Sequence, residues 1–572
     1  MPKSQLEMTT ADRDDTTRYL CAAAHLDPDF ADRSIREFLV ERTRPAPPSP
    51  GVDAGVVLAE AVAARTRRKI VGIAALALLL VLLFSASMAF LLGWLVLAFV
   101  VAVPTATRVA TRGGIKPVLW AVGAVVVVVM LIQYLTEGEI FEVIEELFEG
   151  SSPSYEDYYG TSESETDGVG LAFTILVPLG LLGVFLADRF TVWKLITTQF
   201  NRTSRLPGTL ARSLAGRQIF QFAPTTFTDH LRERYEHPST RMAPDADNPD
   251  DVGSTIVVHR GYDPFVGAGQ GHRPWSIAVP LDRAPGKTGT TTLTTAALYD
   301  AIVDEVTALR TAVGLTPGGR LARLSIDELV AVTAAELVDH MNEPASVPFI
   351  PGEGHPPYDR LSRRLVEQVR DSPIEWARYY RAFRVETWDR DLVLSVYLHV
   401  AMDDTMLYVE WTPCVLRPIK EEFQRIDAMS RSPLHPIGQA LLDLIKFPTS
   451  IPRRLVMVFG LIRSPRKERG VINPDDYGAL SSLRELAADT SERSYFQLVD
   501  RDRYLKIIES RVVRAVSALL HDAGYVTASF EAQATAVIQN NVRIEGSVTG
   551  NVIAGSGNVA GAVTVEKPKG DK

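Results

Sequence analysis

Cysteine is scarce in this chain of 572 residues, which holds only Cys21 and Cys414. Two distant thiols exclude a disulfide framework and a four-thiolate zinc site, so we expect each to be a thiol in a core. An apolar leader is missing as well, because residues 1–17 are polar and acidic. We therefore expect no secretory signal peptide.

Patterns that mark catalytic or metal sites are also missing. The ten histidines include no pair at helical i, i+4 spacing with an intervening Glu, and the sequence contains no GxSxG elbow. Four aspartates between Asp245 and Asp251 lack the glycine turn of a calcium loop. We therefore predict no metal site, no cofactor and no assignable catalytic residue, and this interpretation leans away from an enzyme.

An excess of basic charge is missing too. The chain has 60 Lys and Arg against 69 Asp and Glu, a net charge of −9. Residues 137–167 alone hold eleven carboxylates and no Lys or Arg, so the remainder is nearly neutral. This balance predicts no nucleic-acid partner.

Long apolar runs, by contrast, are present. Ile70 to Val103 is an uncharged run of 34 residues, which as one helix would measure about 51 Å and exceed a hydrocarbon core of about 30 Å. Small and hydroxylated residues at positions 84–87 suit a turn. We therefore predict a transmembrane helical hairpin with two short spans over residues 70–104.

Two further apolar segments predict spans at residues 117–135 and 168–187, enclosing an acidic extracytoplasmic loop at 136–167. Basic residues flank the runs on one predicted side, which the positive-inside rule places in the cytoplasm: Arg65, Arg67, Arg68, Lys69, Arg108, Arg112 and Lys116. The predicted protein is thus a multi-pass α-helical membrane anchor with about four spans, in the plasma membrane with both termini cytoplasmic. The spans hold no ionisable residue, which argues against a transporter or channel.

The remaining segments are predicted to be cytoplasmic. Residues 1–69 read as a helical N-terminal tail interrupted by a stiff proline-rich linker, Pro45 to Gly51. Residues 191–527 read as an α+β domain with antiparallel strands, since apolar runs near 379–388, 392–401 and 405–413 are joined by short aspartate-rich turns. Residues 528–572 form an Asn/Gly-rich tail that is either β-like or disordered and that offers a route to self-association.

Two glycine-rich segments resemble phosphate loops only in part. Leu281 stands where a phosphate-binding loop ending at Lys287 and Thr288 needs its first glycine, and threonines delay the following helix. The segment Val266 to His272 has a GxGxG pattern but is followed by Arg-Pro rather than by a helix. We interpret the second segment as a hairpin loop, with Tyr262, Phe265, Gly267, Gly269 and Trp275 as a candidate binding edge; structural packing is the competing interpretation.

The segment GYDPFVGAGQGHRPWSIAVPLDR around Tyr262 resembles a segment of large, uncharacterised actinobacterial multi-pass membrane proteins. Further matching stretches are residues 18–24 (RYLCAAA), 379–381 (YYR) and 418–427 (PIKEEFQRID). The resemblance covers most of the chain up to about residue 430 and implies no known activity. Our first hypothesis is a membrane-tethered interaction or scaffold protein that contacts the lipid bilayer and an unknown protein partner. The alternative is a membrane-associated enzyme acting on a nucleotide or lipid.

Overall fold

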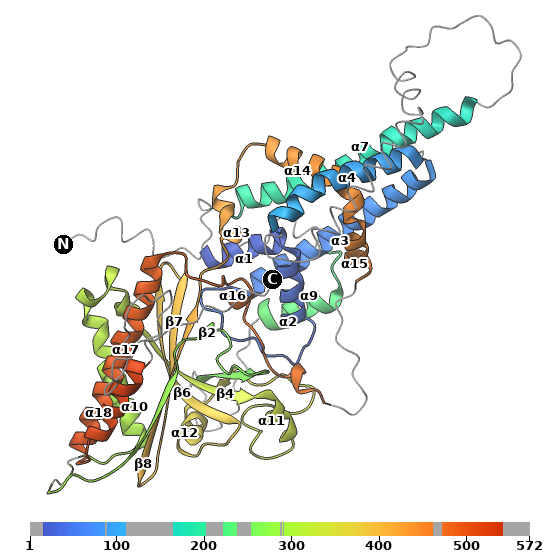
Figure 1. The fold of residues 1–572 in the computed structure, drawn as a ribbon. Helices are drawn as coiled ribbons and strands as arrows, with labels where there is room; N and C mark the ends of the chain where they lie inside the picture. The colour runs from blue at the N-terminus through green and yellow to red at the C-terminus, as the bar shows by residue number, and fades with distance from the viewer. Residues whose placement is uncertain are drawn as a thin grey trace, which may run out of the picture.

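A mixed sheet of eight strands forms the body of the molecule, and a helical arm projects from it (Figure 1). The computed structural model describes residues 15–85, 88–109, 164–201, 221–236, 253–286, 289, 291–460 and 472–540. The predicted span at 117–135, most of the acidic loop at 136–167 and the tail from residue 541 onward therefore lie outside the described residues.

The sheet has the strand order β2-β8-β7-β6-β4-β1-β5, and β3 also pairs with β8. Its strands are β1 (Ser254–His259), β2 (Gln270–Gly271), β3 (Trp275–Pro280), β4 (Ser325–Thr333), β5 (Arg360–Leu361), β6 (Ala377–Thr387), β7 (Leu392–Met402) and β8 (Met406–Leu416). The predicted run of three antiparallel strands is confirmed in β6, β7 and β8. The prediction of an antiparallel sheet is incomplete, however, because β1 pairs with β4 in parallel.

One face of the sheet carries the main core. Helices α10 (Thr295–Thr307), α17 (Tyr495–Asp522) and α18 (Ala528–Asn540) lie against this face, as Figure 1 shows. They bury a continuous set of aliphatic and aromatic side chains that includes Tyr299, Ile508 and Trp411. Helix α18 therefore occupies the start of the segment predicted to be a β-like or disordered tail.

The opposite face of the sheet is covered by chain from distant positions. A smaller core joins Val257, Leu329 and Cys414 of the strands to Phe265 of the glycine-rich loop and Ala479. The proline-rich linker also lies here: a Cβ on Gly267 would come within 2.1 Å of the Pro48 carbonyl oxygen. We call residues 42–51 the strap, because this segment is bound to the body rather than acting as a free spacer.

The N-terminal helices α1 (Asp15–Leu26) and α2 (Pro28–Phe38) form a third core with the first half of α3 (Ala54–Ser85). Short helices of the body join them, namely α9 (Thr225–Leu231), α13 (Glu421–Gln424) and α16 (Leu483–Leu486). Within this core His25 and Glu60 make a buried contact of 2.8 Å. The N-terminal segment is thus an integral part of the body.

The arm consists of the second half of α3, α4 (Met88–Val109) and α7 (Ser164–Thr198), with α14 (Leu434–Ile445) and α15 (Phe447–Phe459) beside them (Figure 1). Helix α3 ends at Ser85 and α4 begins at Met88, where a turn was predicted. Aromatic contacts bind the arm together: Phe447 of α15 lies 5.4 Å from Phe185 and 5.9 Å from Trp94, between ring centroids. Helices from the second half of the chain therefore belong to the same unit as the N-terminal hairpin.

The prediction of about four spans is wrong for the part of the chain that the structure describes. There, one helix is long and apolar enough to cross a membrane, Ile175–Thr198, with a mean hydropathy of 1.8. The apolar part of α3, from Ile70 to Ser85, would measure only about 24 Å, which is shorter than a hydrocarbon core of about 30 Å. The apolar stretch within the described part of α4 is shorter still, Phe90–Phe99.

Two arginines of the basic cluster before the first apolar run have partners inside the protein. Arg65 forms an ion pair with Asp32, and Arg67 lies 3.2 Å from Asp188 of α7. The side chains of both arginines are less than one-tenth exposed. These residues therefore pair with carboxylates inside the protein, which sequence alone could not distinguish from a charge cluster facing lipid headgroups.

Candidate functional site

The predicted binding edge does not form one surface. Phe265 is buried and stacks on Tyr397 with ring centroids 4.2 Å apart, while Tyr380 meets its edge at 5.0 Å. Trp275 is buried on the opposite face of the sheet, where it stacks on Trp411 at 5.9 Å and its Nε1 donates to Glu509 at 2.7 Å. Both aromatic rings therefore serve packing.

The glycine-rich loop between β1 and β2 already has an anionic partner. The amides of Gly267 and Gly269 donate to Glu485 Oε1 at 2.9 and 2.8 Å, and the amide of Ser482 donates to Oε2 at 2.7 Å. Both glycines have positive φ, which lets the loop turn its amides toward one carboxylate. Burial raises the pKa of Glu485, and these amide donors act in the opposite direction. The loop therefore binds a side chain of its own molecule where a phosphate loop would bind phosphate.

Tyr262 is the exposed member of the predicted edge, since its side chain is fully accessible. Next to this turn lies Leu480, which is 57% exposed and would be 3.3 Å from a Cβ on Gly261. The structure thus separates the five predicted residues: one aromatic ring faces solvent, two are in cores, and two glycines shape a closed loop.

Segments that carried the family resemblance lie against one another. Arg18 of RYLCAAA forms a forked pair with Asp427 of PIKEEFQRID at 2.6 and 3.2 Å, and the Tyr19 hydroxyl donates to the same carboxylate at 2.6 Å. Phe30 contacts Phe423 nearby, with ring centroids 5.8 Å apart. These stretches therefore join the N-terminal helices to the body.

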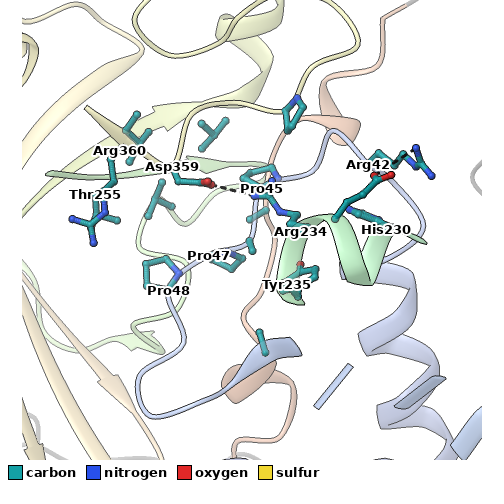
Figure 2. A pocket seen from close by; sticks show the side chains of 18 of the residues that line it. Arg42, Pro45, Pro47, Pro48, His230, Arg234, Tyr235, Thr255, Asp359 and Arg360 are labelled. Atoms are coloured by element: carbon teal, nitrogen blue, oxygen red, sulfur yellow. Dashed lines mark hydrogen bonds and ion pairs between the residues drawn. The ribbon is translucent and has the colours of Figure 1, made fainter. Parts of the chain in front are cut away.

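A cavity of about 630 Å³ lies beneath the strap, and we refer to it as the strap cavity (Figure 2). Most of its lining comes from four separate parts of the chain: the strap, helix α9 with the following π-helical turn η1 (Arg232–Glu236), strand β1, and residues 354–360. Ala54 and Ala479 complete the lining. Figure 2 shows Arg42 and His230 at one end, Thr255 and Arg360 at the other, and three prolines of the strap between them. Polar side chains therefore lie at both ends of the lining that Figure 2 shows.

His230 is the buried titratable group of this cavity. Its side chain is 3% exposed, and Nδ1 lies 3.2 Å from the Leu39 carbonyl oxygen. That carbonyl can only accept, so Nδ1 carries the proton and Nε2 of the neutral ring is an acceptor. Burial lowers the pKa of His230, which favours the neutral ring. Nε2 has no hydrogen-bond partner among the described residues.

Arginine supplies the charge of the cavity. Arg234 donates through Nη2 to Asp359 at 3.1 Å, while its buried Nε has no partner in the described part of the chain. Arg360 donates to the Gly253 carbonyl oxygen at 2.9 Å. At the rim, exposed Arg42 lies 3.8 Å from Glu233. Three arginines thus face two carboxylates along this cavity.

Sequence reasoning missed the strap cavity because its walls are far apart in the chain. The one local signal was the proline-rich segment with arginines just before it, which was interpreted as a stiff linker within the N-terminal tail. Nothing in the spacing of His230, Arg234 and Asp359 indicates that they converge on one site.

No group of three or more His, Cys, Asp or Glu is placed to hold a metal ion among the residues that the structure describes. Cys21 and Cys414 are both buried and are not joined by a disulfide. Burial raises the pKa of the Cys414 thiol well above its ordinary value, which makes it a poor nucleophile. Lys287 and Thr288 lie outside the described residues, and α10 does not begin until Thr295.

Comparison with known proteins places a domain in the second half of the chain. Residues 274–558 match the model of the AbeC-like domain. The match includes residues 379–381 and 418–427 of the resemblance described above and extends past residue 430. It is consistent with an uncharacterised family. No curated protein and no solved structure matches the chain.

Proposed function

We propose that this chain, in which residues 274–558 form an AbeC-like domain, is a membrane-tethered interaction protein of the actinobacterial kind that its sequence resembles. The arm attaches the protein to a lipid bilayer, and the body with its strap presents the interaction surface. The observation that carries this proposal is the exposed apolar surface of the arm helices.

Large apolar side chains of the arm helices point away from the protein. Phe84 is 86% exposed and Leu176 is 61% exposed. Others that are exposed on the same three helices are Ile73, Leu80, Leu83, Leu92, Leu97, Ile175 and Leu179. An exposed apolar surface that recurs over neighbouring helices is typical of contact with lipid or with another protein.

Helices α14 and α15 add further exposed apolar side chains to the surface of the arm, and polar contacts lie beside them. Leu434 of α14 and Val456 and Phe459 of α15 are each more than 70% exposed. Within the arm, Arg189 of α7 forms a forked pair with Asp443 of α14 close to the body, and Trp94 of α4 donates to the Leu444 carbonyl oxygen at 3.2 Å. Charged side chains at the root and apolar side chains beyond it suit a helix group that enters the interfacial layer of a bilayer.

The experiment is membrane fractionation of cells that express the full chain. We expect the protein to remain in the membrane pellet after washes with high salt and alkaline carbonate, and to be released by detergent. Recovery of the full chain in the cytosol without detergent would refute the proposal.

A variant pair tests the arm itself. Val456→Glu with Phe459→Glu places two charges on the exposed face of α15, and we expect it to lower the fraction retained after the carbonate wash. The matched control is Tyr495→Glu with Phe496→Glu, since these residues are equally exposed but lie at the start of α17 in the body. Equal retention of both variants would show that the apolar face of α15 does not contact lipid.

A further inference from the structure

We infer that the arm selects anionic phospholipids through a basic patch beside its apolar surface. The basic patch consists of Lys446, which caps the start of α15, and of Arg453 and Arg454 within that helix. This inference rests on the membrane attachment proposed above and adds the kind of lipid to which the arm attaches. It is carried by the charge of this segment, by its place along the arm and by the packing of Arg454.

The segment that contains the basic patch has an excess of positive charge. Residues 431–459 hold one acidic residue, Asp443, and four basic residues, namely Arg431, Lys446, Arg453 and Arg454. Asp443 already accepts both hydrogen bonds of the forked pair with Arg189. No residue of the basic patch forms an ion pair with a carboxylate in the part of the chain that the structure describes. The patch therefore attracts anions from outside the chain.

Helix α15 lies in the part of the arm nearest to the body. Arg65 of α3 donates to the Gly460 carbonyl oxygen at 3.1 Å, and a Cβ on Gly72 would lie 2.8 Å from Val458. Exposed Phe84 lies about three turns further along α3, and Figure 1 shows the ends of α3, α4 and α7 extending beyond α15. This order suits an arm whose end enters the acyl chains while its basic side chains stay among the headgroups.

The basic patch borders the exposed apolar face of α15. Arg453 is exposed, and Val456, three residues later and therefore its neighbour on the helix surface, is 73% exposed. Lys446, seven residues before Arg453, lies on the same side of the helix. A soluble anion would neutralise these charges but leave Val456 and Phe459 in water, whereas a bilayer of anionic phospholipid contacts both kinds of side chain. The occupant that fits this surface is therefore anionic lipid.

The packing of Arg454 positions a guanidinium for a phosphate group. Its guanidinium carbon lies 4.8 Å from the ring centroid of Phe185 and 5.4 Å from that of Phe447, and its Nε donates to the Ser450 hydroxyl at 3.0 Å. Neither terminal nitrogen has a hydrogen-bond partner among the described residues, and neither is fully buried. The guanidinium thus keeps donors for the phosphate oxygens of a lipid, which match it in geometry and charge.

The test is attachment of the full chain to vesicles of two compositions. The chain is synthesised in a cell-free system with vesicles of phosphatidylcholine, alone or mixed with an equal amount of phosphatidylglycerol, and the fraction that floats with the vesicles is measured. We expect binding to the mixed vesicles to be about twentyfold stronger, and added salt to reduce this preference. Equal flotation with both compositions would overturn this inference and leave the membrane attachment intact. Flotation with neither would overturn both, and the apolar face would then be a surface for another protein.

Variants assign the selectivity to the basic patch. Lys446→Gln with Arg453→Gln should weaken binding to the mixed vesicles about tenfold, and Arg454→Gln about fivefold, with little change on phosphatidylcholine alone. The double variant keeps the inference testable if loss of the Arg454 contacts prevents folding. The matched control is Arg323→Gln with Lys506→Gln, which removes two exposed charges of the body. An unchanged preference in the patch variants, or an equal loss in the control, would contradict the inference.

Discussion

Two concave regions on the same face of the sheet differ in how their polar groups are used. At the glycine-rich loop, one carboxylate accepts from three backbone amides, so the donors that could hold an anion are satisfied within the chain. Among the side chains that line the strap cavity, by contrast, His230 Nε2 and Arg234 Nε are buried without partners in the described residues. The strap runs close to both, since the Pro48 carbonyl oxygen lies against Gly267 and Pro48 also lines the cavity.

The difference shows which features indicate a ligand site. The glycine-rich loop has the more suggestive sequence, but a loop whose amides are already bonded has little left to offer a ligand. The cavity has no recognisable motif, yet two of the side chains that line it carry unsatisfied atoms. A substitution in the glycine-rich loop should therefore lower the stability of the protein strongly, and one in the lining of the strap cavity only weakly. Three predictions test this contrast.

The largest effect is expected for Glu485→Ala. The change leaves three amides without their acceptor, so we expect the free energy of unfolding to fall by about 2–4 kcal/mol. Glu485→Gln keeps a carbonyl oxygen for Gly267 and Gly269 and should lose less. Urea unfolding of the detergent-purified chain measures the loss of unfolding free energy in both variants. The substitution Glu531→Ala, at an exposed residue, is the control. A loss below about 0.5 kcal/mol for Glu485→Ala would show that the carboxylate is not needed to close the loop.

A smaller effect is expected for Phe265→Leu. The substitution removes the stack on Tyr397 and the edge contact with Tyr380 but retains an apolar side chain, so a loss of about 1–2 kcal/mol is expected. Tyr262→Ala, three positions earlier and fully exposed, should change the unfolding midpoint little. If the two variants lose equal stability, the assignment of Phe265 to packing and of Tyr262 to the surface is wrong.

The smallest effect is expected at His230 and concerns pH. Its pKa is lowered in the folded protein by burial, so the unfolded chain binds the proton more readily. Stability is therefore greatest above the unfolded pKa of about 6.5 and falls as the pH drops below it. His230→Asn should make the fall in thermal midpoint between pH 7 and pH 5 shallower. An unchanged slope would show that His230 is already protonated or solvated in the folded state.

Local patterns predicted the strands but not all of their pairing. The runs that became β6, β7 and β8 alternate apolar residues between short turns, so both the strands and their antiparallel order follow from neighbouring residues. The parallel pairing of β1 with β4 does not, because Val257 and Ala331 are partners across a long intervening segment. Periodicity describes one element at a time and carries no information on such a distant partner.

The partners of charged residues in the arm could not be predicted from the sequence either. Arg65 and Arg67 beside an apolar run match the usual sign of a cytoplasmic flank, and that interpretation required no partner. Their actual partners, Asp32 and Asp188, lie on other helices that only the tertiary structure brings close. The strap cavity could not be predicted for the same reason, since four remote segments supply its polar groups.

The position of β1 has a practical consequence for any attempt to isolate the AbeC-like region. That region begins at residue 274, yet β1 spans Ser254–His259 and stands between β4 and β5 in the sheet. A fragment cut at the start of the match would leave the outer backbone groups of β4 bare, and bare strand edges recruit other chains. A fragment that starts before Gly253 should avoid such aggregation better than one that follows the domain match.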